Sequence, residues 1–406
     1  MENMVGNHKA LKLTNQEKLL GLLSKKKYSI SRLSAKTGLS ITGVTTLMNE
    51  FLKYGIVEKV EAKSSSGVGR HPLRWKISPT AGAVAVVTFS RTCNVVFYSL
   101  TGEEKYRFSR PLKATRMTKT ELVAIAKEMH QYMQANYPDT PLLTLTLAVP
   151  GKVDKKGQLL DAPYFEDYRN IDLREIFNDE LNTCIIIQND LNVALCAEYY
   201  VGEYRKLIEN TLFLQIGTGV GAALFLNGKL HEGHNGLSGE IGLFLVDYQA
   251  RTINNHSIHN KYFYNYCSYE RIVGIVKNNI IEGVESSLLG DDITIEKVAA
   301  AYKAGDPLCV GVVEDVARVV GMVLRSITEL FDLGNIIVAK SFNIFGNTFI
   351  KSVETELNRN RKGEFIPIYM SSVEPIHAEE VGAKLMGIEK GIEILCSILS
   401  NKPKEE

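Results

Sequence analysis

The stretch Gly217–Leu243, GTGVGAALFLNGKLHEGHNGLSGEIGL, decides the fold of this 406-residue chain. An apolar segment, LFLQI, leads into its glycine-rich turn, and a second one, AALFL, leads out of it to Asn227-Gly228. Because glycine lets a backbone approach a ligand closely, a turn of this kind can bind a phosphate or a sugar through its N–H groups. The stretch ends with Glu240 between two glycines, where the carboxylate can accept hydrogen bonds from sugar hydroxyls. An ordinary glycine-rich hairpin would account for the glycines alone.

Strands and helices alternate along the body of the chain, residues 79–406, which predicts an α/β fold. Ligands of such folds bind at the carboxyl ends of the strands. Because Gly151, Asn189 and Asp190 follow apolar strands, we expect them to share one cleft with the Gly217 turn, although Asp190 would also suit a simple helix N-cap. The predicted strands are 82–89, 93–100, 142–150, 183–188, 212–216, 222–226, 335–339 and 367–370, and the predicted helices are 118–136, 172–180, one starting at 189, 306–331, 348–360 and 378–399.

The composition is that of a soluble globular protein of two or three domains. The longest apolar runs, such as GAVAVV, are too short to span a bilayer, and the N-terminus has no apolar signal core. Six cysteines are scattered without close pairs, which is typical of reduced thiols. These features predict a cytoplasmic protein.

The net charge of +1 hides an asymmetry between the first 78 residues and the rest of the chain. The first 78 residues hold 14 Lys and Arg against 5 Asp and Glu, whereas the rest holds 33 against 41. A basic head on an acidic body indicates a nucleic-acid partner for the head, and an ordinary solvated basic domain is the alternative.

The head contains the start and stop signals of three helices. Thr14 and Glu17 form a capping-box pattern, Ser31 and Ser40 are placed to cap the second and third helices, and Gly38 ends the second. Two short helices about a glycine-containing turn are typical of the helix-turn-helix. The predicted helices are 14–24, 32–37 and 41–54.

The third helix has an apolar face and a face of short polar side chains. Such side chains, with a glycine among them, suit a DNA major groove better than they suit water, where Lys and Glu are commoner. Two predicted strands, 56–62 and 72–77, flank a basic hairpin tip whose Arg70 can enter a minor groove. We therefore predict a winged helix-turn-helix, with use in protein contacts alone as the alternative. The expected inward residues are Val44, Leu47, Met48, Phe51 and Leu52, and the expected DNA-binding residues are Ser40, Thr42, Gly43, Thr45, Thr46, Asn49, Arg70 and His71.

Taken together, these segments resemble the ROK family of repressors, open reading frames and sugar kinases. In the body, the resemblance rests on LAVPGKVD, QNDLNVALCAEYYVGEY, IGTGVGAALFLNGKL and GLSGEIG. In the head, it rests on ISRLSAKTGLSITGVTTLMNEFLKYGIV and SGVGRHPLRWKI, which are similar to the DNA-binding module of the family's repressors. It covers nearly the whole chain and implies a two-lobed actin/hexokinase-like (ribonuclease H-like) body.

The resemblance also implies roles for individual residues. Asn189 and Asp190 match a sugar-binding pair whose Asp acts as general base in the family's kinases, and Glu240 matches a residue that binds sugar hydroxyls. Gly151 and Lys152 match a loop that covers the sugar, and Gly219 matches a backbone contact. The expected effector-binding residues are therefore Gly151, Lys152, Asn189, Asp190, Gly219 and Glu240.

Two departures from the family pattern concern the nucleotide. The kinases carry an Asp-x-Gly-Gly-Thr phosphate loop, and residues 88–92 of this chain read TFSRT instead. A later Gly-Gly is replaced by Lys340-Ser341. Bulkier residues in both turns hinder the close backbone approach that a triphosphate needs, so we expect no ATP cofactor and no phosphoryl transfer.

A third departure concerns zinc. Leu243 stands where the family has a histidine ligand, and only Cys267 remains of the family's cysteine cluster. His256 and His259 with Cys267 could still form a metal site, but no second cysteine supports it, so we expect no metal.

We therefore predict a sugar-responsive bacterial transcription regulator, most simply a repressor, which acts as a homodimer or tetramer on palindromic operator DNA. A ROK sugar kinase that kept a DNA-binding head, and a body that only dimerises, are the alternatives. The predicted parts are a winged helix-turn-helix at 1–78, a small lobe at 79–200 to which a C-terminal helix at 377–400 returns, and a large lobe at 201–376 with the effector site and the dimerisation surface.

Overall fold

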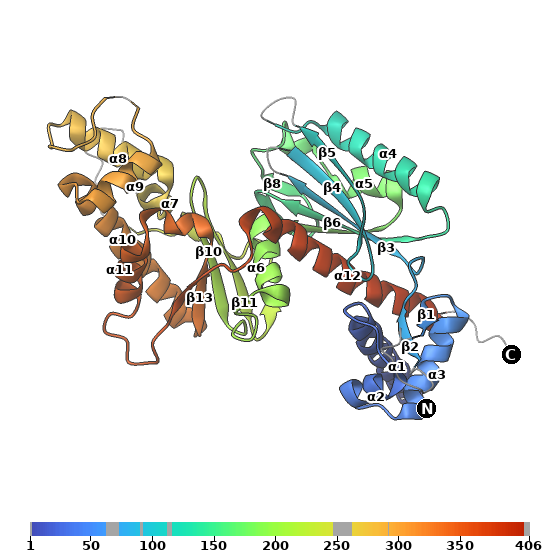
Figure 1. The fold of residues 1–406 in the computed structure, drawn as a ribbon. Coiled ribbons are helices and arrows are strands. Elements are labelled where there is room, and N and C mark those ends of the chain that lie inside the picture. Colours follow the sequence, from blue (N-terminus) through green and yellow to red (C-terminus); the bar gives the residue numbers. More distant parts are fainter. Residues whose placement is uncertain are drawn as a thin grey trace, which may run out of the picture. The chain divides into compact units, whose positions relative to one another are not determined.

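The computed structural model describes residues 2–61, 73–89, 92–111, 116–246, 262–290 and 292–401. The chain forms two compact units (Figure 1). The first unit comprises residues 1–189 together with 380–406, and the second comprises residues 190–379. The backbone therefore passes between the units at two places, after Asn189 and after Glu379.

The head has the predicted order of three helices and two strands. Leu33 of the second helix and Val44, Met48 and Phe51 of the third are buried, which fixes the two helices against one core. Gly38 ends the second helix in the left-handed conformation, with φ +74°. The elements are α1 (Glu2–Leu23), α2 (Ile30–Thr37), α3 (Ile41–Lys53), β1 (Val57–Val60) and β2 (Arg74–Ile77), and the two strands pair antiparallel.

Three details of the head differ from the sequence prediction. Thr14 lies inside α1 and donates to the carbonyl of Ala10 at 3.1 Å, so it is not a cap. Ser29, not Ser31, caps α2 by accepting a hydrogen bond from the N–H of Arg32. Leu52, which we expected inside, is 36% exposed. In each case, a local sequence pattern fitted more than one helix start or face.

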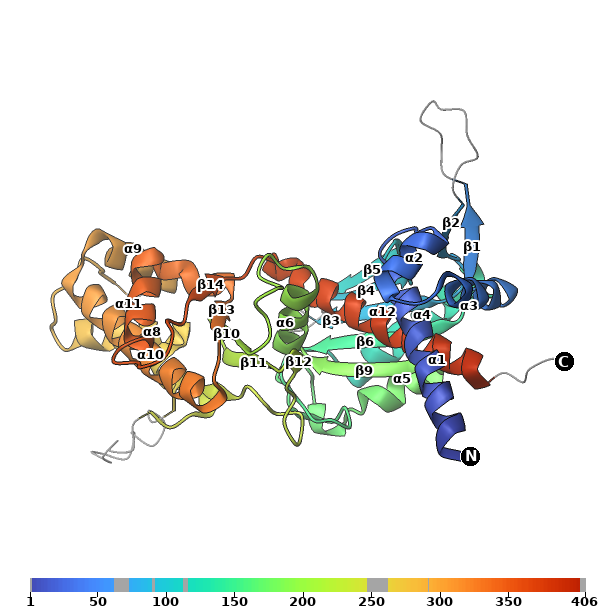
Figure 2. The ribbon, with the colours of Figure 1, turned by 90° about the horizontal axis from the view of Figure 1, so that it is seen from below.

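The body of the first unit is a five-stranded mixed sheet in the order β5-β4-β3-β6-β9. Alternate residues of β3 face opposite sides: Val87 packs with α4 and α5, whereas Val84 contacts Gly391 of α12. Figure 2 shows α12 along this sheet. The strands are β3 (Ala83–Phe89), β4 (Thr92–Ser99), β5 (Glu104–Pro111), β6 (Leu142–Val149) and β9 (Cys184–Asn189), and the helices are α4 (Lys119–Asn136), α5 (Leu173–Leu181) and α12 (Pro375–Asn401).

The sheet of the second unit has the order β12-β11-β10-β13-β14. When the strands of each sheet are numbered in chain order, both sheets have the spatial order 3-2-1-4-5. The two units therefore repeat one topology that the sequence does not reveal. The strands are β10 (Thr211–Ile216), β11 (Val220–Leu226), β12 (Lys229–Leu230), β13 (Asn335–Val338) and β14 (Ile368–Met370), and the helices are α6 (Asp190–Val201), α7 (Tyr264–Cys267), α8 (Tyr269–Ile281), α9 (Ile295–Ala304), α10 (Pro307–Phe331) and α11 (Asn347–Leu357).

The first unit ends at Asn189, 11 residues before the lobe boundary that we predict at residue 200. Helix α6 belongs to the second unit because it packs on β11, where Leu191 meets Gly221 and the Tyr199 and Phe225 rings lie 4.9 Å apart. Most of α12 belongs to the first unit. Within the described ranges, no helix has the length and apolar character that a membrane crossing requires.

Candidate functional site

The predicted DNA-reading face lies on α3. Thr42, Thr46 and Asn49 are exposed, and Gly43 and Thr45 are half-buried. The hydroxyls of Thr45 and Thr46 donate to the carbonyls one turn earlier at 2.8 and 3.0 Å, so both side chains are held against the helix. This leaves an exposed surface of short side chains with no long charged residue among these five.

The start of α3 is fixed by Ser40, whose hydroxyl accepts a hydrogen bond from the N–H of Gly43 at 3.1 Å. Ser40 is therefore a helix cap, and its exposed position also leaves it at the end of the polar face. A cap of this kind stabilises a helix by ~1 kcal/mol. Arg70 and His71, the predicted residues of the wing tip, lie outside the described residues.

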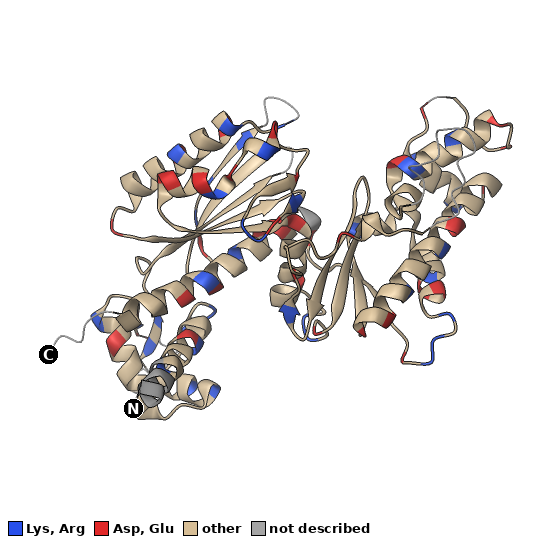
Figure 3. Cartoon of the chain, turned by 180° about the vertical axis from the view of Figure 1, so that it is seen from behind, with Lys and Arg blue, Asp and Glu red and all other residues tan. Residues whose placement is uncertain are grey.

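A basic recess beside α2 was not anticipated from the sequence. Tyr28 and Trp75 exchange backbone hydrogen bonds at 3.1 and 2.8 Å, which brings β2 next to the start of α2. Lys and Arg positions, blue in Figure 3, are spread over the elements of the head. The recess has a volume of about 620 Å³, and its lining residues are Lys26, Lys27, Tyr28, Ser29, Arg32 and Arg74. The run of three lysines at 25–27 was the signal in the sequence.

In the first unit, the structure brings Asn189 and Gly151 together. The side-chain amide of Asn189, at the end of β9, donates to the carbonyl of Gly151 at 2.9 Å. Gly151 has φ +127°, and a Cβ atom there would lie 2.5 Å from the carbonyl oxygen of Asp161, so glycine is required. Lys152 pairs with Asp161 across a short hairpin, with 3.6 Å between Nζ and Oδ2. These contacts hold the loop after β6 against the end of β9.

In the second unit, Asp190, Gly219 and Glu240 all lie around the first residues of β11. Asp190 begins α6, and the next residue, Leu191, packs against Gly221. Gly219 directly precedes β11, and a Cβ atom there would meet nothing within 4 Å. The turn that holds Glu240 is bound to the same strand, because the N–H of Ala222 donates to the carbonyl of Gly239 at 3.0 Å.

The glycines beside Glu240 permit this close packing. A Cβ atom on Gly239 would lie 1.9 Å from the carbonyl oxygen of Ala222, and one on Gly242 would lie 2.8 Å from that of Val220. Gly239 also has φ +94°. Glu240 is half-buried between them, so its carboxylate is placed by the backbone on both sides. Such a carboxylate suits the recognition of paired hydroxyls.

Glu379 adds a second carboxyl near Asp190. Burial raises the pKa of Glu379 to about 8, and the negative charge of Asp190 adds to the shift. At neutral pH, Glu379 is therefore largely protonated and can donate a hydrogen bond as well as accept one. Nothing in the sequence pattern indicated this residue, because it lies 189 positions after Asp190.

The turn after β13 is filled by side chains. The Ser341 hydroxyl donates to the carbonyl of Ile216 at 2.9 Å, and the Tyr269 hydroxyl donates to the carbonyl of Ser341. Lys340 forms an ion pair with Glu374. Burial raises the pKa of Tyr269 to about 12. The backbone of this turn is thus covered where the family pattern has two glycines.

The other predicted departure follows β3. Thr88 and Phe89 are buried, and the Phe89 ring packs edge-on against Phe165 at 5.1 Å. Thr92 begins β4. Ser90 and Arg91 lie outside the described residues, so the shape of this loop stays a prediction from the sequence.

Cys267 is the described residue of the alternative metal site. Its thiol is buried and donates to the carbonyl of Phe263 at 3.3 Å, and burial raises its pKa well above the usual range. A zinc ligand must be a thiolate, which this environment disfavours. Among the described residues, no cluster of three His, Cys, Asp or Glu side chains could hold a metal. His256 and His259 lie outside those residues.

Comparison with known proteins gives consistent matches. The model of the ROK family matches residues 94–384. The xylose repressor of Caldicellulosiruptor bescii is 25% identical over 365 residues, which cover 87% of this chain and 90% of the repressor. The DNA-binding transcriptional dual regulator NagC of Escherichia coli is 22% identical over 364 residues, covering 87% and 86% of the two chains. A solved ROK family transcriptional regulator, a homologue of the E. coli MLC protein, has a TM-score of 0.77 and 20% identity, covering 97% of this chain and all of its own.

Proposed function

Because the chain belongs to the ROK family, we propose that it is a sugar-responsive regulator of transcription, and more specifically a repressor. The observation that carries this proposal is the joining of two features in one chain. The α3 face of short polar side chains precedes a ROK body, and several relatives named as repressors align with 86–90% of their own length.

The head is proposed to bind operator DNA with α3 in the major groove. Thr42, Thr46 and Asn49 would contact base edges, because their side chains are short and exposed. The basic recess at Lys26, Arg32 and neighbouring residues would bind backbone phosphates, which supply affinity without reading sequence. A homodimer would place two such heads on a palindromic site.

The effector is proposed to be a sugar or a sugar derivative. Asp190 and Glu240 converge on the start of β11 and offer carboxylate acceptors, and Gly219 offers an uncovered backbone. Within the first unit, the Asn189–Gly151 hydrogen bond fixes the loop that carries Gly151 and Lys152, the other predicted effector residues. Asp190 would act as a hydrogen-bond acceptor and not as a base.

A sugar kinase is the second candidate, because Asp190 occupies the position of the catalytic base in the kinases. The filled turn at Lys340 and Ser341 opposes it. A coupled ATP assay with a panel of hexoses separates the two functions, and turnover that is lost in Asp190→Asn would favour the kinase.

The proposed DNA surface is tested by operator binding in a fluorescence-anisotropy titration at fixed salt. Asn49→Ala should weaken binding by a factor of roughly 5 to 150, since a good base contact contributes ~1–3 kcal/mol. Arg32→Ala should weaken binding to all DNA sequences alike. It should also reduce the slope of log affinity against log salt concentration by about one. Unchanged affinity in both variants would contradict the proposed surface.

The proposed effector site is tested by thermal shift with sugars and sugar phosphates, with and without Mg-ATP. A ligand at a hundred times its dissociation constant stabilises the folded state by ~2.7 kcal/mol. A shift with one sugar that disappears in Glu240→Ala would support the site. A shift with Mg-ATP would instead favour the kinase.

A further inference from the structure

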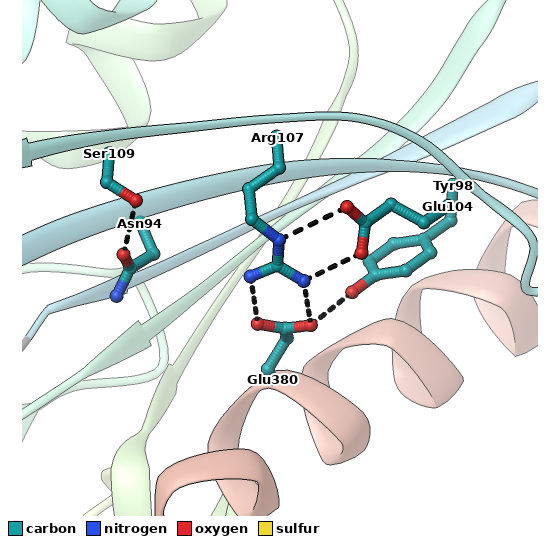
Figure 4. Close-up of polar contacts among 6 residues, drawn as sticks. All are labelled: Asn94, Tyr98, Glu104, Arg107, Ser109 and Glu380. Carbon is teal, nitrogen blue, oxygen red and sulfur yellow. Dashed lines mark hydrogen bonds and ion pairs between the residues drawn. The ribbon is translucent and has the colours of Figure 1, made fainter.

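The second connection between the two units is held on both sides by a carboxylate. Glu198 binds the segment just before α12 in the second unit, and Glu380 binds the sheet of the first unit (Figure 4). We propose that these two anchors confine the bending of the connection to residues 374–379 and thereby transmit effector binding to the DNA-binding head. The inference rests on the proposed function and adds the two residues that couple its two sites.

Glu198 is fully buried on α6 and accepts three hydrogen bonds from the segment that leaves β14. One oxygen accepts from the Ser371 hydroxyl at 2.7 Å and from the N–H of Val373 at 2.9 Å. The other accepts from the Ser372 hydroxyl at 2.8 Å. A buried carboxylate is costly unless it is fully hydrogen-bonded, and here three donors converge on it. They all come from the connection, so α6 and the connection move together.

Gly202 makes room for this arrangement. A Cβ atom at Gly202 would lie 2.2 Å from a carboxylate oxygen of Glu198. The next residue, Glu203, donates its N–H to the Ser372 hydroxyl at 2.9 Å, which closes the network from the end of α6. The sequence around Glu198 is therefore built to bind the connection, in addition to its role in packing.

Glu380 provides the anchor in the first unit. Its carboxylate accepts two hydrogen bonds from the Arg107 guanidinium, both at 2.7 Å, and one from the Tyr98 hydroxyl. Glu104 holds the same guanidinium from its other side, with contacts of 2.8 and 3.2 Å (Figure 4). A two-pronged Arg–carboxylate pair has a defined geometry, so it fixes the orientation of α12 as well as its position.

Only six residues, 374–379, separate Val373 from Glu380. They contain Glu379, whose pKa is raised by burial and further by the charge of Asp190 at the proposed effector site. Asp190 begins α6 and Glu198 lies on the same helix, so a shift of α6 on ligand binding reaches the connection through Glu198.

Helix α12 carries the change toward the head. It has 27 residues and is therefore about 40 Å long. Its glycines let it approach the sheet closely, and the carbonyl of Gly387 accepts a hydrogen bond from Thr144 at 3.0 Å. Near its far end, the Ser400 hydroxyl donates to the side chain of Gln16 on α1 at 3.3 Å. Gln16 is fully buried in the packing of α1, so a displacement of α12 would also displace α1.

The test measures how much sugar binding changes operator affinity, in addition to the two affinities themselves. Operator affinity of the full-length wild type, Glu198→Gln and Glu380→Gln is measured with and without each of D-xylose, D-glucose and N-acetyl-D-glucosamine and the 6-phosphates of the two hexoses. Glutamine keeps the shape of each anchor but removes the charge. We expect both variants to bind operator and sugar within threefold of wild type, while the sugar-induced change in operator affinity falls at least fivefold.

The matched control is Glu282→Gln, which also removes one negative charge but at an exposed position at the end of α8. It should keep the full sugar-induced change in operator affinity. If Glu198→Gln does not fold, Ser372→Ala removes one of the three bonds and should show a smaller loss of the same kind. Full coupling in folded Glu198→Gln and Glu380→Gln would overturn the inference and leave the proposed function intact. A wild type that responds to no sugar would overturn both.

Discussion

Two turns of the second unit, at Gly239–Gly242 and at Lys340-Ser341, pack their backbones in opposite ways. The turn at Gly239–Gly242 keeps its glycines, and its backbone lies directly on the carbonyls of β11. In the turn at Lys340-Ser341, the Ser341 hydroxyl donates to the carbonyl of Ile216, and the Ser341 carbonyl accepts from the Tyr269 hydroxyl. The first turn holds the Glu240 carboxylate that we propose binds the effector, whereas side chains fill the second turn where the family pattern has two glycines. This contrast fits our proposal that the turn at Glu240 binds a sugar and that the turn at Lys340-Ser341 has a structural role.

The largest effect that tests this contrast is expected at Gly239. In Gly239→Ala, the new methyl group would lie 1.9 Å from the carbonyl oxygen of Ala222, in a backbone conformation with φ +94°. We expect a loss of roughly 3 kcal/mol or more in the free energy of unfolding, measured by urea denaturation. The control is Gly219→Ala, where a Cβ atom meets nothing within 4 Å and the loss should be under about 1 kcal/mol. Equal losses would show that the turn does not depend on close backbone contact.

The next effect concerns the carboxyl group of Glu379, close to Asp190, and is read from the pH dependence of stability. Burial raises the pKa of Glu379 from 4.5 to about 8. Between these values the folded chain holds a proton that the unfolded chain has released, so this group makes the protein less stable as pH rises from about 5 to 8. Glu379→Gln stays neutral at every pH. Its stability relative to wild type should therefore increase over that range, by on the order of 4 kcal/mol, and level off above it.

Thermal denaturation at pH 5, 6, 7, 8 and 9 measures this difference. Glu282→Gln, an exposed change of the same kind, should show no such trend. A difference that is flat with pH would mean that Glu379 is ionised throughout and that the Asp190 end of the site tolerates two negative charges.

A smaller effect is expected in the filled turn. Ser341→Ala removes the hydroxyl that binds the carbonyl of Ile216 at 2.9 Å, and it should cost ~1 kcal/mol of stability. Sugar binding should be unchanged, because this turn is not the sugar half of the site. Urea denaturation and the sugar titration are run on the same sample, and a loss of sugar affinity would remove the proposed division between the two turns.

The smallest effect is expected for Lys340→Ala, which removes an exposed ion pair with Glu374. Exposed pairs contribute about 0–1 kcal/mol, so we expect at most 0.5 kcal/mol at low salt and less at high salt. A double-mutant cycle with Glu374→Ala isolates the pair. A coupling well above 1 kcal/mol would mean that this pair helps to fix residues 374–379.

Several parts of the fold were predictable because the signal is local. Ser40 and Gly38 bound the helices of the head as expected, since a cap or a positive φ needs only neighbouring residues. Asn227-Gly228, with φ +53° and +70°, forms the predicted turn after β11. The strand β5 was missed, because residues 104–111 are largely polar and exposed at a sheet edge. The helices α8 and α9 were not assigned either.

The sequence by itself determined the residue types of this protein's sites: short polar side chains on α3, a glycine-flanked Glu240, and side chains in place of the glycines at 340–341. Only the tertiary structure decided which of them meet. The gathering of Asp190, Gly219 and Glu240 at the start of β11, the pairing of Asn189 with Gly151, and the burial of Glu198 beneath residues 371–373 depend on contacts between distant segments. The physical reason is that caps and turns are fixed by neighbours along the chain, whereas hydrogen bonds of a buried carboxylate are fixed by whatever the fold brings to it.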